Sequence, residues 1–319
     1  MEKKEVKKTE IFQWDAPQPE DYDTIKKGDM PGDVIRINEG HIAKANAIFP
    51  KVYQLVTAIL DTRPTDKAVI SVHGGSGVGK SEIGALLAYY FNDLGIGSYI
   101  LSGDNYPHRI PKYNDQERLR IFRERGLKGF VAQGAYNKER GEQLRELQAQ
   151  GHDFDPNLIH EHPWLFIYQQ EGRKGLEAYL GTSAEIDFEE ISNIIAQFKG
   201  GKDHILLKRM GRAETDIWYD KVDFTDVKVM IIEWTHGNNA ALIGVDVPIL
   251  LNSTPSETLA HRKLRNRDGG TDSPFTTLVL DIEQNLLFSQ AAEAKIIVLK
   301  DGEVVSYEAY KQIMLDEGL

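Results

Sequence analysis

The stretch Ala68-Val-Ile-Ser-Val-His-Gly-Gly-Ser-Gly-Val-Gly-Lys-Ser81 decides the fold that the sequence predicts. An apolar run breaks into glycines and ends on a lysine and a serine, which fits the pattern G-x-x-x-x-G-K-[ST]. A strand signal precedes the pattern and a helical pattern follows it, and a phosphate-binding loop requires this context. The stretch therefore predicts a nucleotide-binding loop between a strand and a helix, although a plain glycine-rich turn is the alternative.

Each position of this loop has a physical role in the prediction. Glycines lack a Cβ atom, so the backbone can turn successive N–H groups inward at a helix N-terminus and bind an anion there. The residues expected to bind ATP are Gly74, Gly75, Ser76, Gly77, Val78, Gly79, Lys80 and Ser81. Lys80 is expected to bridge the β and γ phosphates, and the Ser81 hydroxyl to bind Mg²⁺. A dinucleotide pattern G-x-G-x-x-G starting at Gly75 fails, because Lys80 occupies its last position.

The composition limits the class of protein. The chain has 319 residues, of which 41% are hydrophobic and 27% charged, as in globular proteins. Cysteine is absent, which excludes disulfides and a cysteine nucleophile. The formal charge of -11 opposes a broad contact with nucleic acid, and no run of 18 apolar residues occurs. We expect a cytoplasmic protein that acts on a small molecule without nucleic-acid or membrane partners, and a homo-oligomer remains open.

Acidic residues follow two further predicted strands. The strand at 98–101 leads into Ser102-Gly-Asp-Asn-Tyr-Pro107, and the apolar strand at 227–233 ends on Glu233. Open α/β sheets place their chemistry at the carboxyl ends of their strands. Asp104 is therefore the candidate general base, and Glu233 a candidate Mg²⁺ ligand. In the alternative interpretation Asp104 merely forms a turn and Glu233 merely ends a strand.

The remaining patterns predict a doubly wound α/β fold, in which a mostly parallel sheet of about five strands carries helices on both faces. Helical patterns around residues 139–150, 163–180 and 187–199 lie between the two halves of the sheet. We divide the chain into an N-terminal arm with a packing helix (1–60), the first part of the core (61–126), a helical insertion or cap (127–203) and the second part of the core with a lid (204–319).

The predicted lid is a basic helix. Thr254-Pro-Ser-Glu257 has the sequence of a helix start, and the helix that it opens carries Arg262 and Arg265 on one face. Guanidinium groups suit a bidentate contact with a transferring phosphoryl group. We expect both arginines to contribute to catalysis, with a solvated basic helix as the alternative.

Together these stretches resemble the phosphoribulokinase and uridine kinase family, over roughly residues 66–125 and 204–300. In that family the Asp of S-x-D-x-[FY] takes the proton of the substrate hydroxyl, which implies this role for Asp104. The resemblance also implies Mg²⁺ binding by Glu233 and phosphate contacts by Arg262 and Arg265. The residues expected on the substrate side are Asp104, Tyr106, His108, Arg109, Arg209 and Arg212.

Departures from the family pattern bear on the substrate. Uridine kinases usually have a Phe-Tyr pair where this chain has Tyr106-Pro107, and Lys208-Arg-Met-Gly-Arg212 lacks the aromatic residues of their base-reading segment. Arg209 and Arg212 suit an anionic acceptor such as a sugar phosphate or an organic acid. The stretch 99–108 also resembles the D-G-D-N-x-x-H segment of adenylylsulfate kinases, without a match after residue 125.

These observations predict an ATP-dependent kinase that phosphorylates a hydroxyl group of a small, anionic metabolite. Two other classes stay open: a nucleotide-dependent ATPase or switch acting on a protein partner, and a scaffold that binds nucleotide without turnover. The presence of an acid at the end of two strands favours the kinase, because a switch does not need a base for an acceptor hydroxyl.

Overall fold

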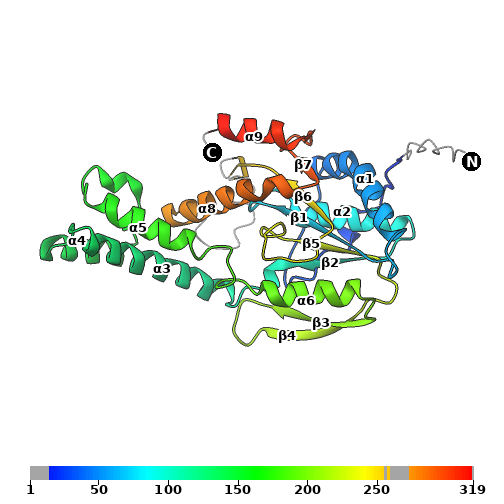
Figure 1. Cartoon of the computed structure of the whole chain (residues 1–319), viewed down its shortest axis with the longest axis horizontal. Helices are drawn as coiled ribbons and strands as arrows, with labels where there is room; N and C mark the ends of the chain where they lie inside the picture. Colours follow the sequence, from blue (N-terminus) through cyan, green and yellow to red (C-terminus); the bar gives the residue numbers. More distant parts are fainter. Residues whose placement is uncertain (1–13, 255–256, 259–272, 318–319) are drawn as a thin grey trace, which may run out of the picture.

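A six-stranded sheet in the order β2-β5-β1-β6-β7-β8 forms the centre of the molecule (Figure 1). The computed structural model describes residues 14–254, 257–258 and 273–317. The strands are β1 (Ala68–Gly74), β2 (Ser98–Ser102), β5 (Val229–Glu233), β6 (Val247–Leu251), β7 (Ile296–Val298) and β8 (Val304–Val305). Five of them are parallel, and only β8 pairs antiparallel, with β7. The predicted mostly parallel α/β sheet is confirmed, with one short edge strand added.

Helices cover both faces of this sheet. α1 (Glu39–Leu60) and α2 (Lys80–Asp93) pack on one face, where Ile70 and Val72 of β1 join their core. On the other face, α6 (Phe188–Lys199) packs around Val69. α8 (Pro274–Gln290) and α9 (Tyr307–Asp316) cover β6 and β7. A strand buried on both faces needs an apolar side chain at nearly every position, which explains the continuous apolar runs in the sequence.

A helical arm projects from the sheet (Figure 1). It consists of α3 (Pro111–Ala132), α4 (Lys138–Gln150) and α5 (Leu165–Glu177). Glycines let α3 and α5 cross closely: a Cβ atom at Gly126 would lie 2.7 Å from the carbonyl oxygen of Tyr168, and one at Gly172 would lie 2.9 Å from that of Phe122. Any larger side chain at these two positions would push the helices apart.

Several predicted elements appear with changed bounds. The helical patterns around 139–150, 163–180 and 187–199 are confirmed as α4, α5 and α6. The helix α3 runs from Pro111 to Ala132 without a break at Gly126, because Gly126 faces α5 and does not end the helix. The sequence did not predict the antiparallel hairpin of β3 (His204–Met210) and β4 (Ile217–Asp223). The four-segment division of the chain stays a prediction.

Residues 14–37 pack against the core. The ring of Trp14 lies 4.3 Å from that of Phe49 in α1, measured between centroids. Residues 25–37, here called the N-terminal strap, begin with the buried Ile25 and lead to α1. The strap lies along the edge of the sheet formed by β2, so it reaches the site described below.

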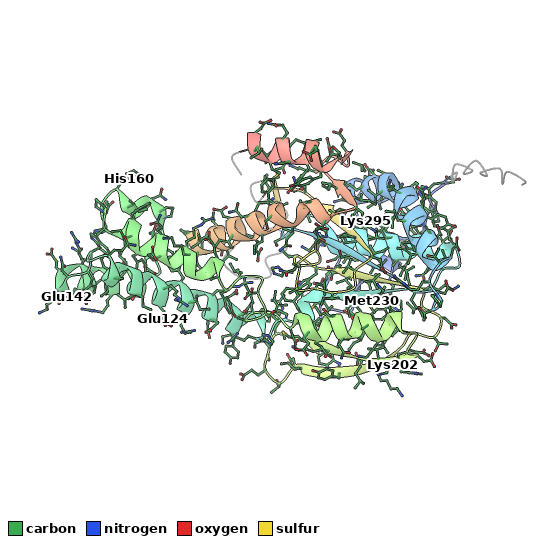
Figure 2. The ribbon with its side chains drawn as sticks, in the orientation of Figure 1. Glu124, Glu142, His160, Lys202, Met230 and Lys295 are labelled. Carbon is green, nitrogen blue, oxygen red and sulfur yellow. The ribbon has the colours of Figure 1, made fainter. Side chains whose placement is uncertain are left out.

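The side chains are sorted as expected for a globular chain. Figure 2 shows Met230 inside the sheet region, whereas Glu124 and Glu142 lie on the arm and Lys202 on the outer surface near β3 and β4. Figure 2 also places His160 on the arm, away from the sheet. Among the residues that the structure describes, no helix is both long and apolar enough to cross a membrane, and no group of three potential metal-binding side chains occurs.

Candidate active site

The parallel register brings the ends of three strands to one edge of the sheet. Ser102 of β2 pairs with Glu233 of β5, and Glu233 pairs with Val72 of β1, two residues before Gly74. The glycine loop, the Asp104 turn and Glu233 therefore start from neighbouring points. This edge is where open α/β sheets bind their ligands.

The glycine loop has the backbone that its sequence predicts. Gly77 and Gly79 have φ angles of 81° and 94°, in the left-handed region that favours glycine. A Cβ atom at Gly74 would lie only 2.3 Å from the carbonyl oxygen of Leu251. Gly79 is also the N-cap residue of α2 and brings no side chain to the first N–H groups of that helix. Those groups therefore face the loop, as a phosphate site requires.

The side chains predicted to hold phosphate and metal meet at this loop. The Lys80 ammonium donates a hydrogen bond of 2.9 Å to the carbonyl oxygen of Gly75. The Ser81 hydroxyl donates one of 2.8 Å to Oε2 of Glu233, so the two predicted Mg²⁺ ligands lie side by side. Mg²⁺ prefers a hydroxyl and a carboxylate oxygen of this kind, and the pair therefore fits the metal.

Glu233 has an unusual electrostatic environment. Only 4% of the residue is exposed, and burial together with the nearby Asp104 carboxylate raises its pKa to about 7. The hydroxyls of Ser102 and Ser81 and the Lys80 ammonium oppose this shift without cancelling it. A carboxyl group with this pKa changes its charge near neutral pH, and a bound cation would favour the charged form.

Asp104 lies in a single helical turn, Gly103–Asn105, directly after β2. Asp104 is exposed, whereas its neighbours Gly103 and Asn105 are buried. Gly103 packs directly against the indole ring of Trp234, because a Cβ atom at this position would lie 2.0 Å from Trp234 Cγ. The turn is thus fixed on both sides while its carboxylate remains accessible, and this is the arrangement that a base for an external hydroxyl needs.

The N-terminal strap braces the Asp104 turn through Asp29, which sequence reasoning missed. Its Oδ1 accepts hydrogen bonds from Ser102 N at 2.7 Å and Asn105 Nδ2 at 3.2 Å. Its Oδ2 accepts from Tyr99 Oη and Arg209 Nη1, each at 2.9 Å. Burial raises the pKa of Asp29 against the opposing effect of the Arg209 charge. The nearest signal in the sequence, an acid in a charged and proline-rich segment, does not predict these contacts.

Two residues expected on the substrate side are occupied within the chain. Arg209 of β3 binds Asp29 and also donates to Oδ2 of Asp220 at 3.0 Å. Tyr106 is fully buried in the core beside α6, its hydroxyl has no hydrogen-bond partner among the described residues, and burial raises its pKa. The geometry gives both residues internal positions, so it does not support the substrate contacts predicted for them.

Of the remaining predicted residues, two contact residues at 179–183, one is exposed and two lie outside the described part of the chain. His108 Nε2 donates to the carbonyl oxygen of Ser183 at 3.0 Å, and Arg109 Nη1 donates to Tyr179 Oη at 3.0 Å. Arg212 is exposed and follows β3. Thr254 and Glu257 form the predicted reciprocal helix-start bonds. Arg262 and Arg265, and with them the predicted lid, lie outside the described residues.

Three further charged residues form what we call the acid–arginine cluster: Arg118 of α3, Glu185 before α6 and Glu283 of α8. Arg118 Nε donates to Glu185 Oε1 at 2.7 Å, and Arg118 Nη2 lies 3.9 Å from Glu283 Oε1. Glu283 lines a small cavity together with Gly75 and Ser76 of the glycine loop. The sequence did not indicate this cluster, because its members come from three separate segments.

The sheet order, the glycine loop between β1 and α2 and the acids at the strand ends define a P-loop nucleotide-binding fold. The chain is 37% identical over 254 residues to the bifunctional alpha-galactosidase/sucrose kinase AgaSK of Mediterraneibacter gnavus. This match covers 80% of the chain and 22% of the relative, so the chain spans about a fifth of that relative's length. The predicted resemblance to P-loop kinases is confirmed, since the relative is described as a kinase.

Two solved structures are also similar to the chain. One, from Silicibacter sp. TM1040, is assigned as a fructose transport system kinase; the match has 16% identity and a TM-score of 0.41 and covers 74% of this chain and 88% of that one. The other, from Bacillus stearothermophilus, is assigned as a uridine kinase; the match has 12% identity and a TM-score of 0.36 and covers 77% of this chain and 98% of that one. No protein-family model matches the chain.

Proposed function

We propose that the protein transfers the γ-phosphoryl group of ATP to a hydroxyl group of a small metabolite, with a sugar as the first candidate. The observation that carries the proposal is the convergence of Asp104 with Lys80, Ser81 and Glu233 at one edge of the sheet. A general base for an external hydroxyl then lies beside a site for Mg-ATP, which is the arrangement that phosphoryl transfer to an alcohol needs.

Each residue has a stated role in this proposal. Lys80 and the loop N–H groups hold the β and γ phosphates, and Asp104 orients the acceptor hydroxyl and takes its proton. Ser81 and Glu233 would hold Mg²⁺, which supplies charge neutralisation at the phosphates. The roles of Arg262 and Arg265 in contacting the transferring group are proposed from the family resemblance alone.

The relative supports a sugar as acceptor. Any contiguous stretch of 254 residues in a chain of 319 includes all positions from 66 to 254, so the matched region holds the glycine loop, Asp104 and Glu233. That relative is described as both a galactosidase and a sucrose kinase. A kinase needs a nucleotide and a galactosidase does not, so we assign the matched region to its kinase activity. The anionic acceptor expected from the sequence depended on Arg209 and Arg212, and Arg209 already binds two carboxylates of the chain.

The test is ADP formation by the purified protein with Mg-ATP and a panel of acceptors. The panel contains neutral mono- and disaccharides including sucrose, sugar phosphates, hydroxy acids, nucleosides and adenylylsulfate. Asp104→Asn is compared with Asp93→Asn, which removes an exposed carboxylate at the end of α2. We expect one acceptor class to stimulate ADP formation, and Asp104→Asn to lower kcat by about 10²–10⁴-fold while Asp93→Asn does not.

Other outcomes would replace the proposal with a different function. ADP formation that is equal without any acceptor and survives Asp104→Asn indicates an ATPase or switch. Nucleotide binding without any product indicates a scaffold. Stimulation by adenylylsulfate alone indicates the activity suggested by residues 99–108.

A further inference from the structure

The acid–arginine cluster contains two glutamates in very different states. Glu185 is saturated: it accepts hydrogen bonds from Arg118 Nε at 2.7 Å, Asn114 Nδ2 at 2.9 Å and the Gly181 N–H at 2.7 Å. Among the described residues, the charged partner of Glu283 is the Arg118 guanidinium, at 3.9 Å, which is too long for a hydrogen bond. Within the described residues the Glu283 carboxylate accepts no hydrogen bond.

The Glu283 carboxylate is largely shielded from water although it accepts no hydrogen bond within the described residues. Its side chain is 13% exposed, and shielding a polar group from water without a hydrogen bond costs free energy. Its neighbour Gln284 repeats the pattern, since its Nε2 is buried and has no partner among the described residues. Two adjacent side chains of α8 thus keep hydrogen-bonding capacity that the described chain does not use.

Both side chains face the place where phosphoryl transfer is proposed. Glu283 and Gln284 line a small cavity with Gly75 and Ser76 of the glycine loop, at the end where Lys80 is bonded. Burial raises the pKa of Glu283, and the Arg118 and Lys80 charges oppose this shift whereas those of Glu185 and Asp104 reinforce it. Glu283 therefore shares its surroundings with the proposed base and the phosphate-binding lysine.

The chemistry of the cluster selects between acceptor classes. A sugar hydroxyl both donates and accepts hydrogen bonds, so it can donate to Glu283 and accept from Arg118 at the same time. A phosphate or carboxylate group on the acceptor would meet the two carboxylates Glu283 and Asp104, and like charges at short range disfavour binding. The cluster thus suits an uncharged compound with several hydroxyl groups.

We infer that Glu283 and Arg118 bind the acceptor, that Glu283 does so by accepting a hydrogen bond from a hydroxyl next to the one that is phosphorylated, and that the acceptor is an uncharged sugar. This inference rests on the proposed function and deepens it. It makes α8 and the base of the helical arm two walls of the acceptor site.

The test compares Glu283→Gln with Asp281→Asn in steady-state kinetics with the best neutral sugar of the panel. Asp281 is an exposed acid two residues away on the same helix. We expect Glu283→Gln to raise the KM for the sugar at least about tenfold, because a site that hydrogen-bonds a hydroxyl depends on it, while the KM for ATP changes less than about twofold. Asp281→Asn should behave like the wild type.

Deoxy sugars supply a second readout that a loss of folding would not imitate. In the wild type, removal of the hydroxyl that contacts Glu283 should lower kcat/KM by at least about tenfold. In Glu283→Ala the same deoxy sugar and its parent should differ by less than about threefold, since this variant has no side-chain acceptor left for the hydroxyl.

The outcomes separate this inference from the proposed function. If the wild type phosphorylates no acceptor, the proposed function is wrong. If it phosphorylates a neutral sugar and Glu283→Gln has the wild-type KM for every sugar, only the inference is overturned. A wild type that prefers a sugar phosphate to the parent sugar also overturns it, while kinase activity as such stands.

Discussion

Asp29 and Glu283 are two largely buried carboxylates that each face an arginine, and their contacts differ sharply. Their side chains are 9% and 13% exposed. Asp29 lies 2.9 Å from Arg209 and accepts three further hydrogen bonds of 2.7–3.2 Å. Glu283 lies 3.9 Å from Arg118 and accepts none within the described residues. Burial alone therefore does not distinguish a structural acid from a ligand-binding one.

The difference is explained by where the donors come from. The donors of Asp29 belong to β2, the Asp104 turn and the hairpin, so the strap closes a network of internal partners. The cavity beside Glu283 is lined by the glycine loop, where substrates are expected to supply the donors. Satisfied buried networks make a structure rigid, whereas an unused acceptor next to a binding loop is available to a ligand or to water.

The largest effect should follow from breaking the Asp29 network. Asp29→Ala leaves the buried Arg209 with the half-exposed Asp220 as its one carboxylate partner among the described residues. We expect the free energy of unfolding to fall by about 3–5 kcal/mol, as found when one partner of a buried ion pair is removed. Urea unfolding of the variant and the wild type measures it, and a loss below about 1 kcal/mol would contradict the structural role.

Glu233 is intermediate between Asp29, with its several hydrogen bonds, and Glu283, with none among the described residues. It has one short hydrogen bond and a pKa raised to about 7. The Glu233 carboxyl binds its proton more tightly in the folded state than in the unfolded state, where its pKa is near 4.5. Protonated Glu233 therefore favours folding at low pH, and this contribution is lost as the pH rises from about 4.5 to about 7. In metal-free protein, the stability of the wild type relative to Glu233→Gln should fall by about 1.4 kcal/mol per pH unit in this window.

Urea unfolding of both proteins at intervals between pH 4.5 and 8 measures this difference. Above pH 7 the difference should become constant. A difference that is flat throughout, or that rises with pH, would show that burial does not raise the pKa of Glu233.

A smaller effect should appear in catalysis when Asp29, which holds the Asp104 turn, is replaced by the uncharged residue of the same shape. Asp29→Asn retains an oxygen for the Ser102 N–H and weakens the contact with Arg209. We expect kcat to fall about tenfold with an unchanged KM for ATP, because small misplacements of a catalytic group slow the reaction. Asp220→Asn is the matched control, since Asp220 binds Arg209 without touching the turn, and it should keep the wild-type kcat.

The smallest effect should be that of Glu283 on stability. Because the one ion pair of its carboxylate within the described part of the chain is the long contact with Arg118, Glu283→Gln should change the free energy of unfolding by less than about 1 kcal/mol. Arg118 keeps its bond to Glu185 in this variant. A loss as large as that of Asp29→Ala, measured under the same conditions, would mean that Glu283 is structural and would remove the contrast between the two acids.

Local patterns were enough to predict the nucleotide loop and the parallel sheet. Gly74, Gly77 and Gly79 have positive φ angles, which glycine adopts more readily than other residues. The positions of the glycines in the sequence are therefore enough to predict this loop conformation. The strand-end positions of Asp104 and Glu233 also followed from the sequence, because parallel strands carry their carboxyl ends to one edge. The predicted lid around Arg262 and Arg265 lies outside the described residues and stays a prediction.

The remaining part of the site depends on contacts between distant segments, which no local pattern encodes. Arg209 was expected to bind a substrate anion, but Asp29, 180 residues away in the sequence, occupies it. Likewise, Glu283 meets Arg118 only because α8 packs beside the base of the arm. The sequence by itself determined which chemistry the loop supports, since backbone conformation is a local property. Only the tertiary structure decided which charged side chains are already paired and which remain for a ligand, because pairing depends on the distance between atoms after folding.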